Sequence, residues 1–280
     1  MRKINVKKVK NTVAELCIEA NIRLRSDIRQ AIKKAIRKET SGRAKRALGI
    51  LLENARIARR EKRALCQDTG IACIYIKIGQ DVRFTGGDLK KAVQRGVAEG
   101  YRKAYLRKSV VKSPILRINT RTNTPSVIYT DIVNGDKVKI TVMPKGFGSE
   151  NKSRLSMLKP TQGEKDIADF VVEAVREAGP DACPPYILGI GIGGTFDRVA
   201  LLAKEALLLP VDKPNANRHL RSLEKAILER VNRLGIGPIG YGGRTTCLAV
   251  RVLEHPTHIA GLPVAVNIGC HITRSASKVI

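Results

Sequence analysis

The chain lacks any apolar stretch that could cross a lipid bilayer. Hydrophobic residues make up 43% of its 280 positions, but none of their runs approaches the roughly 20 consecutive residues that span a membrane. Residues 1–5 are not followed by the apolar core of a signal peptide. A membrane-spanning or exported protein is therefore not favoured, and we expect a globular cytoplasmic protein.

Cysteine is sparse, and its spacing excludes the common local metal motifs. The six cysteines include no Cys-x-x-Cys pair, so neither a zinc ribbon nor the local ferredoxin spacing is present. Six cysteines are also few for a disulfide scaffold of this length, and without an export signal we expect reduced thiols. Any metal cluster would have to be assembled from segments far apart in the sequence.

Aromatic side chains are missing from the most basic part of the chain. Residues 1–63 hold 20 Lys or Arg and 6 Asp or Glu, a net charge of +14 out of +27, but no Phe, Tyr or Trp. Nucleic-acid bases therefore have no aromatic side chain to stack on in this segment. It could bind nucleic acid only through electrostatic contacts with the phosphate backbone. An acidic partner subunit, an anionic substrate or a solvated helical face would explain the charge equally well, so nucleic acid is not the partner we favour.

Apolar periodicity predicts alternating helices and strands. Helical spacing is found over 26–36, 47–55, 88–105, 166–178, 196–209 and 216–234. Runs typical of strands cover 71–78, 186–188, 248–253 and 264–268. Asn134-Gly135 predicts the tight turn of an antiparallel hairpin over 126–142. We expect a mixed α/β fold in which helices surround mixed sheets. No repeat or linker marks a boundary, so residues 1–280 are expected to form one domain, with room for two lobes.

A glycine motif offers one alternative function. Gly189, Gly191 and Gly194 satisfy the G-x-G-x-x-G pattern between an expected strand and helix, and Asp212 follows where a ribose-binding acid would lie. No regular series of βαβ units surrounds the motif, so dinucleotide binding is not the favoured interpretation. The favoured one is a helix N-terminus whose amides face an anion.

Three cysteines differ from the others in their surroundings. Cys66 opens Cys66-Gln67-Asp68-Thr69-Gly70, Cys183 precedes two prolines, and Cys270 lies between Gly269 and His271. Thiolates in such turns suggest an iron–sulfur cluster with one iron open to substrate, although context alone leaves ligation undecided. Cys17, Cys73 and Cys247 lie in apolar helix or strand patterns and are expected to be small buried hydrophobes.

Four motifs in chain order carry a resemblance to one family. They are Cys66–Gly70, Gly-Ser-Glu-Asn-Lys at 148–152, the glycine motif at 189–195, and His258 with Cys270. With them the chain resembles the class I, iron–sulfur fumarate hydratases and their tartrate dehydratase relatives, over about residues 10–275. The closest form is the alpha subunit of the two-subunit enzymes.

This resemblance implies a cofactor and a set of site residues. It implies a 4Fe–4S cluster on Cys66, Cys183 and Cys270, with substrate bound at the fourth iron. It also implies substrate contacts and a proton-transferring pair of Asp68 and His258. The implied substrate contacts are made by Gln67, Asp68, Arg107 and the backbone of Gly148.

The implied activity is the reversible hydration of fumarate to malate, a reaction of the tricarboxylic acid cycle. Tartrate dehydration is the same chemistry, and no residue here separates the two. The family also needs a C-terminal domain, for which the chain, ending at Ile280, has no room. We therefore expect a separate beta subunit, a heterotetramer or larger assembly, and little turnover by the chain alone. A basic, non-catalytic binding protein on the same scaffold is the remaining hypothesis.

Overall fold

The computed structural model describes residues 1–280, which divide into two compact units. The first unit contains Met1–Leu24, Asn54–Phe147 and Arg274–Ile280, and the second contains Arg25–Glu53 and Gly148–Thr273. None of the helices combines the length and the apolar character that a membrane-spanning segment needs. Each unit has its own apolar core.

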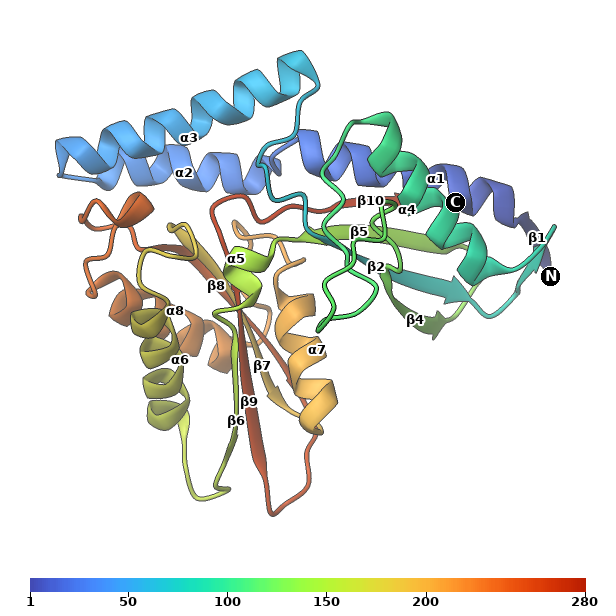
Figure 1. Ribbon diagram of the computed structural model, residues 1–280. Helices are drawn as coiled ribbons and strands as arrows, with labels where there is room; N and C mark the ends of the chain where they lie inside the picture. Colours follow the sequence, from blue (N-terminus) through green and yellow to red (C-terminus); the bar gives the residue numbers. More distant parts are fainter. The chain divides into compact units, whose positions relative to one another are not determined.

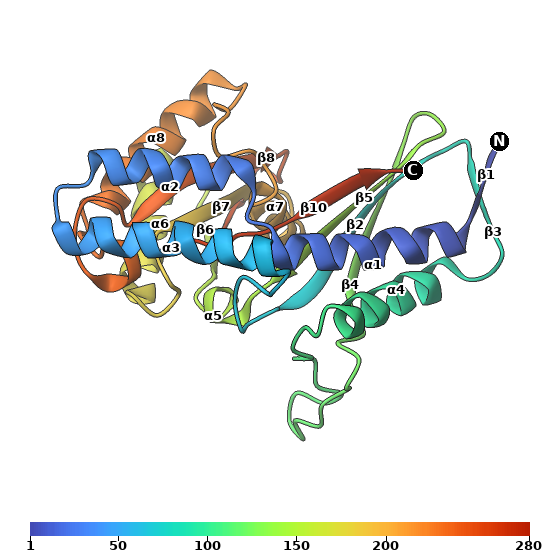
Figure 2. The ribbon, with the colours of Figure 1, turned by 90° about the horizontal axis from the view of Figure 1, so that it is seen from above.

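A four-stranded mixed sheet forms the centre of the first unit. Its order is β10 (Ala276–Val279), β5 (Val138–Lys145), β2 (Ile71–Gly79) and β4 (Val127–Val133). Two short strands, β1 (Arg2–Asn5) and β3 (Val82–Thr85), pair separately in parallel. Helices α1 (Val6–Ile22) and α4 (Leu89–Lys103) lie side by side (Figure 2) and share the apolar core with the sheet. Gly96 and Gly100 permit this approach, because a Cβ there would lie within 2.7 Å of a carbonyl oxygen of α1.

The predicted antiparallel hairpin over 126–142 is wrong in its pairing. Strands β4 and β5 form where they were expected, and the turn between them contains Gly135 at a φ of +98°. However, β2 lies between them, parallel to β4 and antiparallel to β5. Residues 72–76 of β2 are all buried, so this apolar strand gains most from a central position. The turn residues predict that the chain reverses direction, but they do not indicate that β2 lies between β4 and β5.

The second unit is layered around another mixed sheet (Figure 1). Its order is β6 (Arg154–Leu158), β9 (Leu262–Gly269), β7 (Tyr186–Gly193) and β8 (Cys247–His255). Only β7 and β8 run parallel. Helices α6 (Glu164–Ala178) and α8 (Arg218–Asn232) cover one face, and α7 (Phe196–Ala206) covers the other. These two units confirm the predicted mixed α/β class.

Several shorter or peripheral elements complete the chain. Helix α2 (Ser26–Lys38) belongs to the second unit and lies beside α3 (Gly42–Glu61), which begins in the second unit and ends in the first (Figures 1 and 2). The one-turn helix α5 (Phe147–Glu150) precedes β6, and the 3-10 helix η1 (Pro238–Gly240) precedes β8.

The glycine motif has a packing role that its sequence pattern did not indicate. Gly189 and Gly191 lie inside β7, which continues to Gly193 instead of ending at 188. A Cβ on Gly189 would lie 2.1 Å from the carbonyl oxygen of Ala203, and one on Gly191 would lie 2.3 Å from that of Val199. These glycines therefore let α7 pack closely on β7. Because β7 is antiparallel to β9, the all-parallel sheet of a dinucleotide-binding domain is absent.

Candidate active site

The turn after α3 fixes the carboxylate of Asp68 in the first unit. Its Oδ1 accepts the backbone N–H of Gly70 at 3.0 Å, and its Oδ2 accepts that of Phe147 at 2.7 Å. Gly70 makes the turn possible, with a φ of +71° and Lys145 backbone atoms where a Cβ would stand. The Sγ of Cys66 accepts the N–H of Asp68 at 3.4 Å. The thiol and the carboxylate are thus held in one short segment.

Arg107 is brought next to this turn by buried polar contacts. Thr69, 1% exposed, donates its hydroxyl to the carbonyl of Arg107 at 2.6 Å. The hydroxyl of Tyr101 donates to the carbonyl of Thr69 at 2.7 Å, and Asn123 donates to that of Gly70 at 3.1 Å. Burial raises the pKa of Tyr101, so its hydroxyl stays a donor. The side chain of Arg107 itself is exposed, so its guanidinium is available to an anion.

Arg274 is a site residue that the sequence does not reveal. It is 4% exposed, its Nη2 donates to the carbonyl of Asp68, and its Nε donates to that of Pro144 at 3.3 Å. It lies four residues after Cys270, in a segment without a recognisable motif. Tyr101 and Asn123 were missed for the same reason, because they support the turn through backbone carbonyls. The only sequence feature that could have indicated these residues is weak, namely a polar side chain among apolar neighbours.

In the second unit, Cys183 and Cys270 lie on adjoining loops. The carbonyl of Cys183 accepts the backbone N–H of His271 at 3.3 Å and contacts its Nδ1 at 3.0 Å. Burial is the main cause that raises the pKa of Tyr186, and electrostatic interactions with Cys183 and with Cys270 raise it further. Cys183 is exposed and Cys270 is half-buried. Two of the three predicted ligands are therefore neighbours within one unit.

The six thiols fall into two groups by burial, and only the more accessible group suits iron–sulfur ligands. None of the six forms a disulfide. Cys17, Cys73 and Cys247 are at most 3% exposed, as expected, and burial raises the pKa of Cys17 and of Cys247 to about 12. Cys66, Cys183 and Cys270 are exposed or half-buried and form no disulfide, so this set fits a cluster. No three His, Cys, Asp or Glu side chains gather into a metal site, and the three thiols are divided between the two units.

The other two predicted residues, Gly148 and His258, lie in the second unit. His258 is exposed in the turn after β8, and its Nδ1 accepts the backbone N–H of Ala260 at 3.2 Å, which leaves its Nε2 for another partner. Gly148 lies in α5 with open space where a Cβ would stand. Asp68 belongs to the first unit, so its pairing with His258 stays a prediction.

Comparisons with known proteins match almost the whole chain. Residues 10–279 match the family described as "Fumarate hydratase (Fumerase)". A Methanocaldococcus jannaschii protein named "Putative L(+)-tartrate dehydratase subunit alpha" is 39% identical over 280 residues, covering 97% of both chains. The "L(+)-tartrate dehydratase subunit alpha" of Escherichia coli strain UTI89 is 30% identical over 269 residues, covering 95% of this chain and 88% of its own. That of strain K12 is 29% identical over 279 residues, covering 98% and 91%.

Proposed function

From the premise that the chain belongs to the fumarate hydratase (Fumerase) family of hydro-lyases, we propose that it is the alpha subunit of a two-subunit, iron–sulfur enzyme. The reaction is the reversible removal of water from a 2-hydroxy dicarboxylate, with malate and fumarate as the first substrate pair. The observation that carries the proposal is the Asp68 turn, which holds a thiol, an amide and a fixed carboxylate next to Arg107.

L(+)-Tartrate is a second candidate substrate. The names of the Methanocaldococcus and Escherichia relatives favour it. Malate and tartrate differ by one hydroxyl group, and the residues that carry the proposal recognise carboxylates. The choice between the two substrates therefore has to come from an assay.

Cys66, Cys183 and Cys270 would hold the 4Fe–4S cluster. When bound, the cluster supplies a Lewis-acidic iron that polarises the hydroxyl group to be eliminated. These three thiols form no disulfide and are exposed or half-buried, which supports this assignment. The absence of disulfides and an oxygen-sensitive cofactor also favour the reducing cytoplasm as the compartment.

The chain's own polar groups bind the dicarboxylate and handle its protons. The guanidinium of Arg107 can grip one carboxylate with two parallel hydrogen bonds. The amide of Gln67 and the backbone of Gly148 would orient the remaining oxygens. Asp68 would hold or release a proton, with His258 as its partner in the transfer. Since two backbone amides fix both oxygens of Asp68, its carboxylate needs no reorganisation when the substrate arrives.

A beta chain would complete the site. The word "alpha" in the relatives' names supports a second subunit, and we propose an assembly of at least a heterotetramer. The net charge of +27 would attract the dicarboxylate and suit an acidic surface of the partner.

Anaerobic co-expression with a candidate beta chain tests the proposal. We expect a brown complex that converts malate or L(+)-tartrate, while the chain alone turns over neither. Cys66→Ser, Cys183→Ser and Cys270→Ser should each abolish the visible absorbance of the cluster. Cys17→Ala, Cys73→Ala and Cys247→Ala should keep it. Full activity of the lone chain would refute the split site. Polyanion binding without iron, unchanged by the three serine substitutions, would favour the non-catalytic binding protein.

A further inference from the structure

Helix α2 is anchored to the second unit at its first turn. Arg25 donates to the carbonyls of Leu207 and Leu209, each at 2.7 Å. The same guanidinium pairs with the carboxylate of Asp27, which accepts the backbone N–H of Val211 at 2.9 Å. The two charged side chains are only 11% and 13% exposed. This end of α2 is therefore fixed by hydrogen bonds from which water is largely excluded.

The other end of α2 is held just as firmly by its C-cap residue, Glu39. This side chain is 2% exposed, and its carboxylate accepts the backbone N–H of Thr40 at 2.9 Å, of Arg244 at 2.9 Å and of Thr245 at 3.2 Å. Burial alone would raise the pKa of Glu39, but these amides outweigh it and lower the pKa below the usual carboxyl value. Glu39 therefore stays ionised and ties α2 to the segment that leads into β8.

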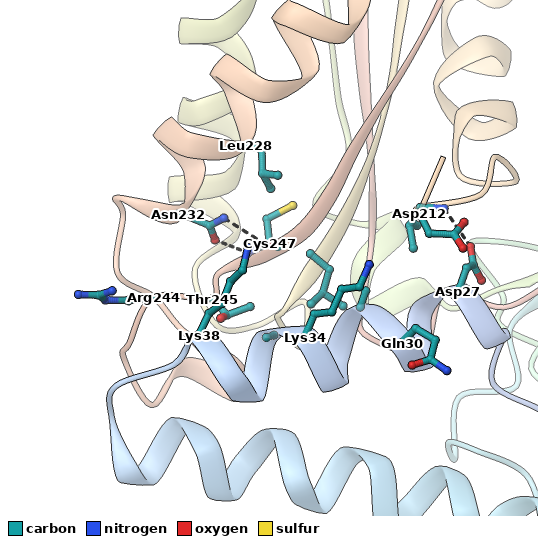
Figure 3. A pocket seen from close by; sticks show the side chains of 14 residues that line it. Asp27, Gln30, Lys34, Lys38, Asp212, Leu228, Asn232, Arg244, Thr245 and Cys247 are labelled. Carbon is teal, nitrogen blue, oxygen red and sulfur yellow. Dashed lines mark hydrogen bonds between the residues drawn. The ribbon is translucent and has the colours of Figure 1, made fainter. Parts of the chain in front are cut away.

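Between these anchors, α2 spans a cavity of about 550 Å³ (Figure 3). Ala31 and Ala35 of α2 line one wall, and Leu228, Cys247 and Leu248 line the opposite side. A volume of this size is typical of a site for a small organic molecule, where about 300–1,000 Å³ is usual. Because both ends of the helix are fixed, the cavity is built into the unit.

The charges around the cavity are uneven. Lys34, Lys38 and Arg244 line it, and none of their side chains has an ion-pair or hydrogen-bond partner. Of the two lining carboxylates, Asp27 is already engaged by Arg25, which leaves Asp212. Lys38 and Arg244 lie at one end of the cavity and the two aspartates at the other (Figure 3). The cavity thus offers a cationic end beside an apolar wall.

We propose that this cavity binds a small organic dianion. Its negative group would lie between Lys34 and Lys38, and its apolar part would lie against Ala31 and Leu228. A phosphate monoester and a dicarboxylate both present this chemistry. The site is independent of the hydro-lyase function, because none of the residues proposed for that function lines the cavity.

Isothermal titration calorimetry of the full chain tests the proposal with three probes. Adenosine 5′-monophosphate carries nearly two negative charges at pH 7, phthalate is an aromatic dicarboxylate, and inorganic phosphate has the charge without an apolar part. We expect saturable binding of at least one organic probe with a stoichiometry of one, at least about tenfold tighter than inorganic phosphate. The tighter of the two organic probes identifies the anionic group. If neither saturates, the proposal fails.

Matched charge variants separate the cavity from the general positive field of the chain. Lys34→Ala with Lys38→Ala removes two charges that face the cavity, and Lys33→Ala with Arg37→Ala removes two exposed charges of the same helix that do not line it. We expect the first pair of substitutions to weaken binding at least about tenfold. The second pair should weaken binding less than about threefold, because salt screens charges that do not contact the ligand. Equal weakening by both pairs would overturn the proposal.

A filled cavity provides a second test without a change in charge. Ala31→Phe should occupy the apolar wall and abolish binding of the organic probes, with a melting temperature close to that of the wild type. Unchanged affinity in this variant would overturn the proposal. The lysine variants alter only exposed side chains, so they decide the question even if Ala31→Phe does not fold.

Discussion

The buried guanidinium of Arg274 holds the main chain of Asp68. Nη2 of Arg274 donates to the carbonyl of Asp68, and Nε donates to that of Pro144. Its Nη1 is buried without a hydrogen-bond partner. A buried cation whose donors are not all paired is unfavourable on its own. Arg274 is therefore a fixed positive charge behind the turn that carries the proposed catalytic carboxylate.

Replacement of Arg274 by Met should affect both stability and turnover. One buried and one half-buried carbonyl lose their donor, so we expect the free energy of unfolding to fall by about 2–4 kcal/mol. In the complex with the beta chain, kcat should fall about 10- to 100-fold, because Asp68 is no longer held in place. KM should change less, since Arg107 and Gln67 are intact. Urea unfolding and steady-state kinetics measure these effects.

Arg274→Lys is the matched control for that substitution. It keeps the charge and can still donate to one of the two carbonyls, so it should recover part of the lost kcat. If Arg274→Met lowers stability but leaves kcat unchanged, Arg274 is only a structural residue and the positioning role is wrong.

Two glycines should respond in opposite directions to alanine. Gly191→Ala places a Cβ 2.3 Å from the carbonyl oxygen of Val199, so β7 and α7 must separate. We expect a loss of about 1–3 kcal/mol, typical of an overpacked core. Gly49, inside α3, has nothing within 4 Å of its Cβ position, so Gly49→Ala should add up to about 1 kcal/mol through helix propensity. Thermal unfolding of both variants gives the comparison, and a stable Gly191→Ala would contradict the packing role.

Local patterns in the sequence were sufficient to predict most elements but not their partners. The apolar face of 26–36 and the buried run at 71–78 correspond closely to α2 and β2. The position of β2 between β4 and β5 depends on which strand buries most surface, and turn chemistry at Asn134-Gly135 contains no information about that. The glycine motif has a similar ambiguity, because close packing and anion binding require the same residue.

The candidate site shows the same division between local and distant information. The sequence motif at Cys66–Gly70 identified the Asp68 turn, since its thiol, amide and carboxylate are consecutive. The contacts of Arg274 with Asp68 and of Tyr101 with Thr69 join residues far apart in the chain. They involve main-chain carbonyls, which every residue has, so no sequence pattern marks them. That the three proposed ligands, Cys66, Cys183 and Cys270, meet at one cluster stays a prediction.

The acid stability of the first unit should depend on Glu99. Its carboxylate pairs with Lys10 at 2.8 Å and with Lys103 at 2.6 Å. The hydrogen bond from Lys10, followed by that from Lys103, lowers the pKa of Glu99 from 4.5 to about 2. A lowered folded-state pKa means stabilisation that is complete above about pH 4.5 and is lost as the pH falls toward 2.

Glu99→Gln removes this pH-dependent contribution. The urea midpoint of the wild type should fall more steeply between pH 5 and pH 2.5 than that of the variant, and the difference should shrink at high salt, because the pairs are screened by ions. Parallel pH curves for the two proteins would show that Glu99 has the same pKa in the folded and unfolded states.

The buried ion pair of Glu224 with Arg251 provides the largest expected loss of stability. The two side chains are each 8% exposed and 2.9 Å apart. The carboxylate of Glu224 also accepts the N–H of Val252 and the amide of Asn215. Glu224→Met leaves Arg251 charged, buried and unpaired, so we expect the free energy of unfolding to fall by about 3–5 kcal/mol.

Two further variants show whether the loss comes from the unpaired charge. Glu224→Met combined with Arg251→Met removes both charges, so it should be more stable than Glu224→Met alone. Glu229→Gln, on the same helix, breaks an exposed contact to Lys225 at 4.0 Å and should change stability by less than about 0.5 kcal/mol. Denaturant unfolding of the three variants and the wild type gives the comparison. The double variant contains no unpaired charge. If it is nevertheless the least stable of the three, the loss comes from packing and from the lost bonds to Val252 and Asn215.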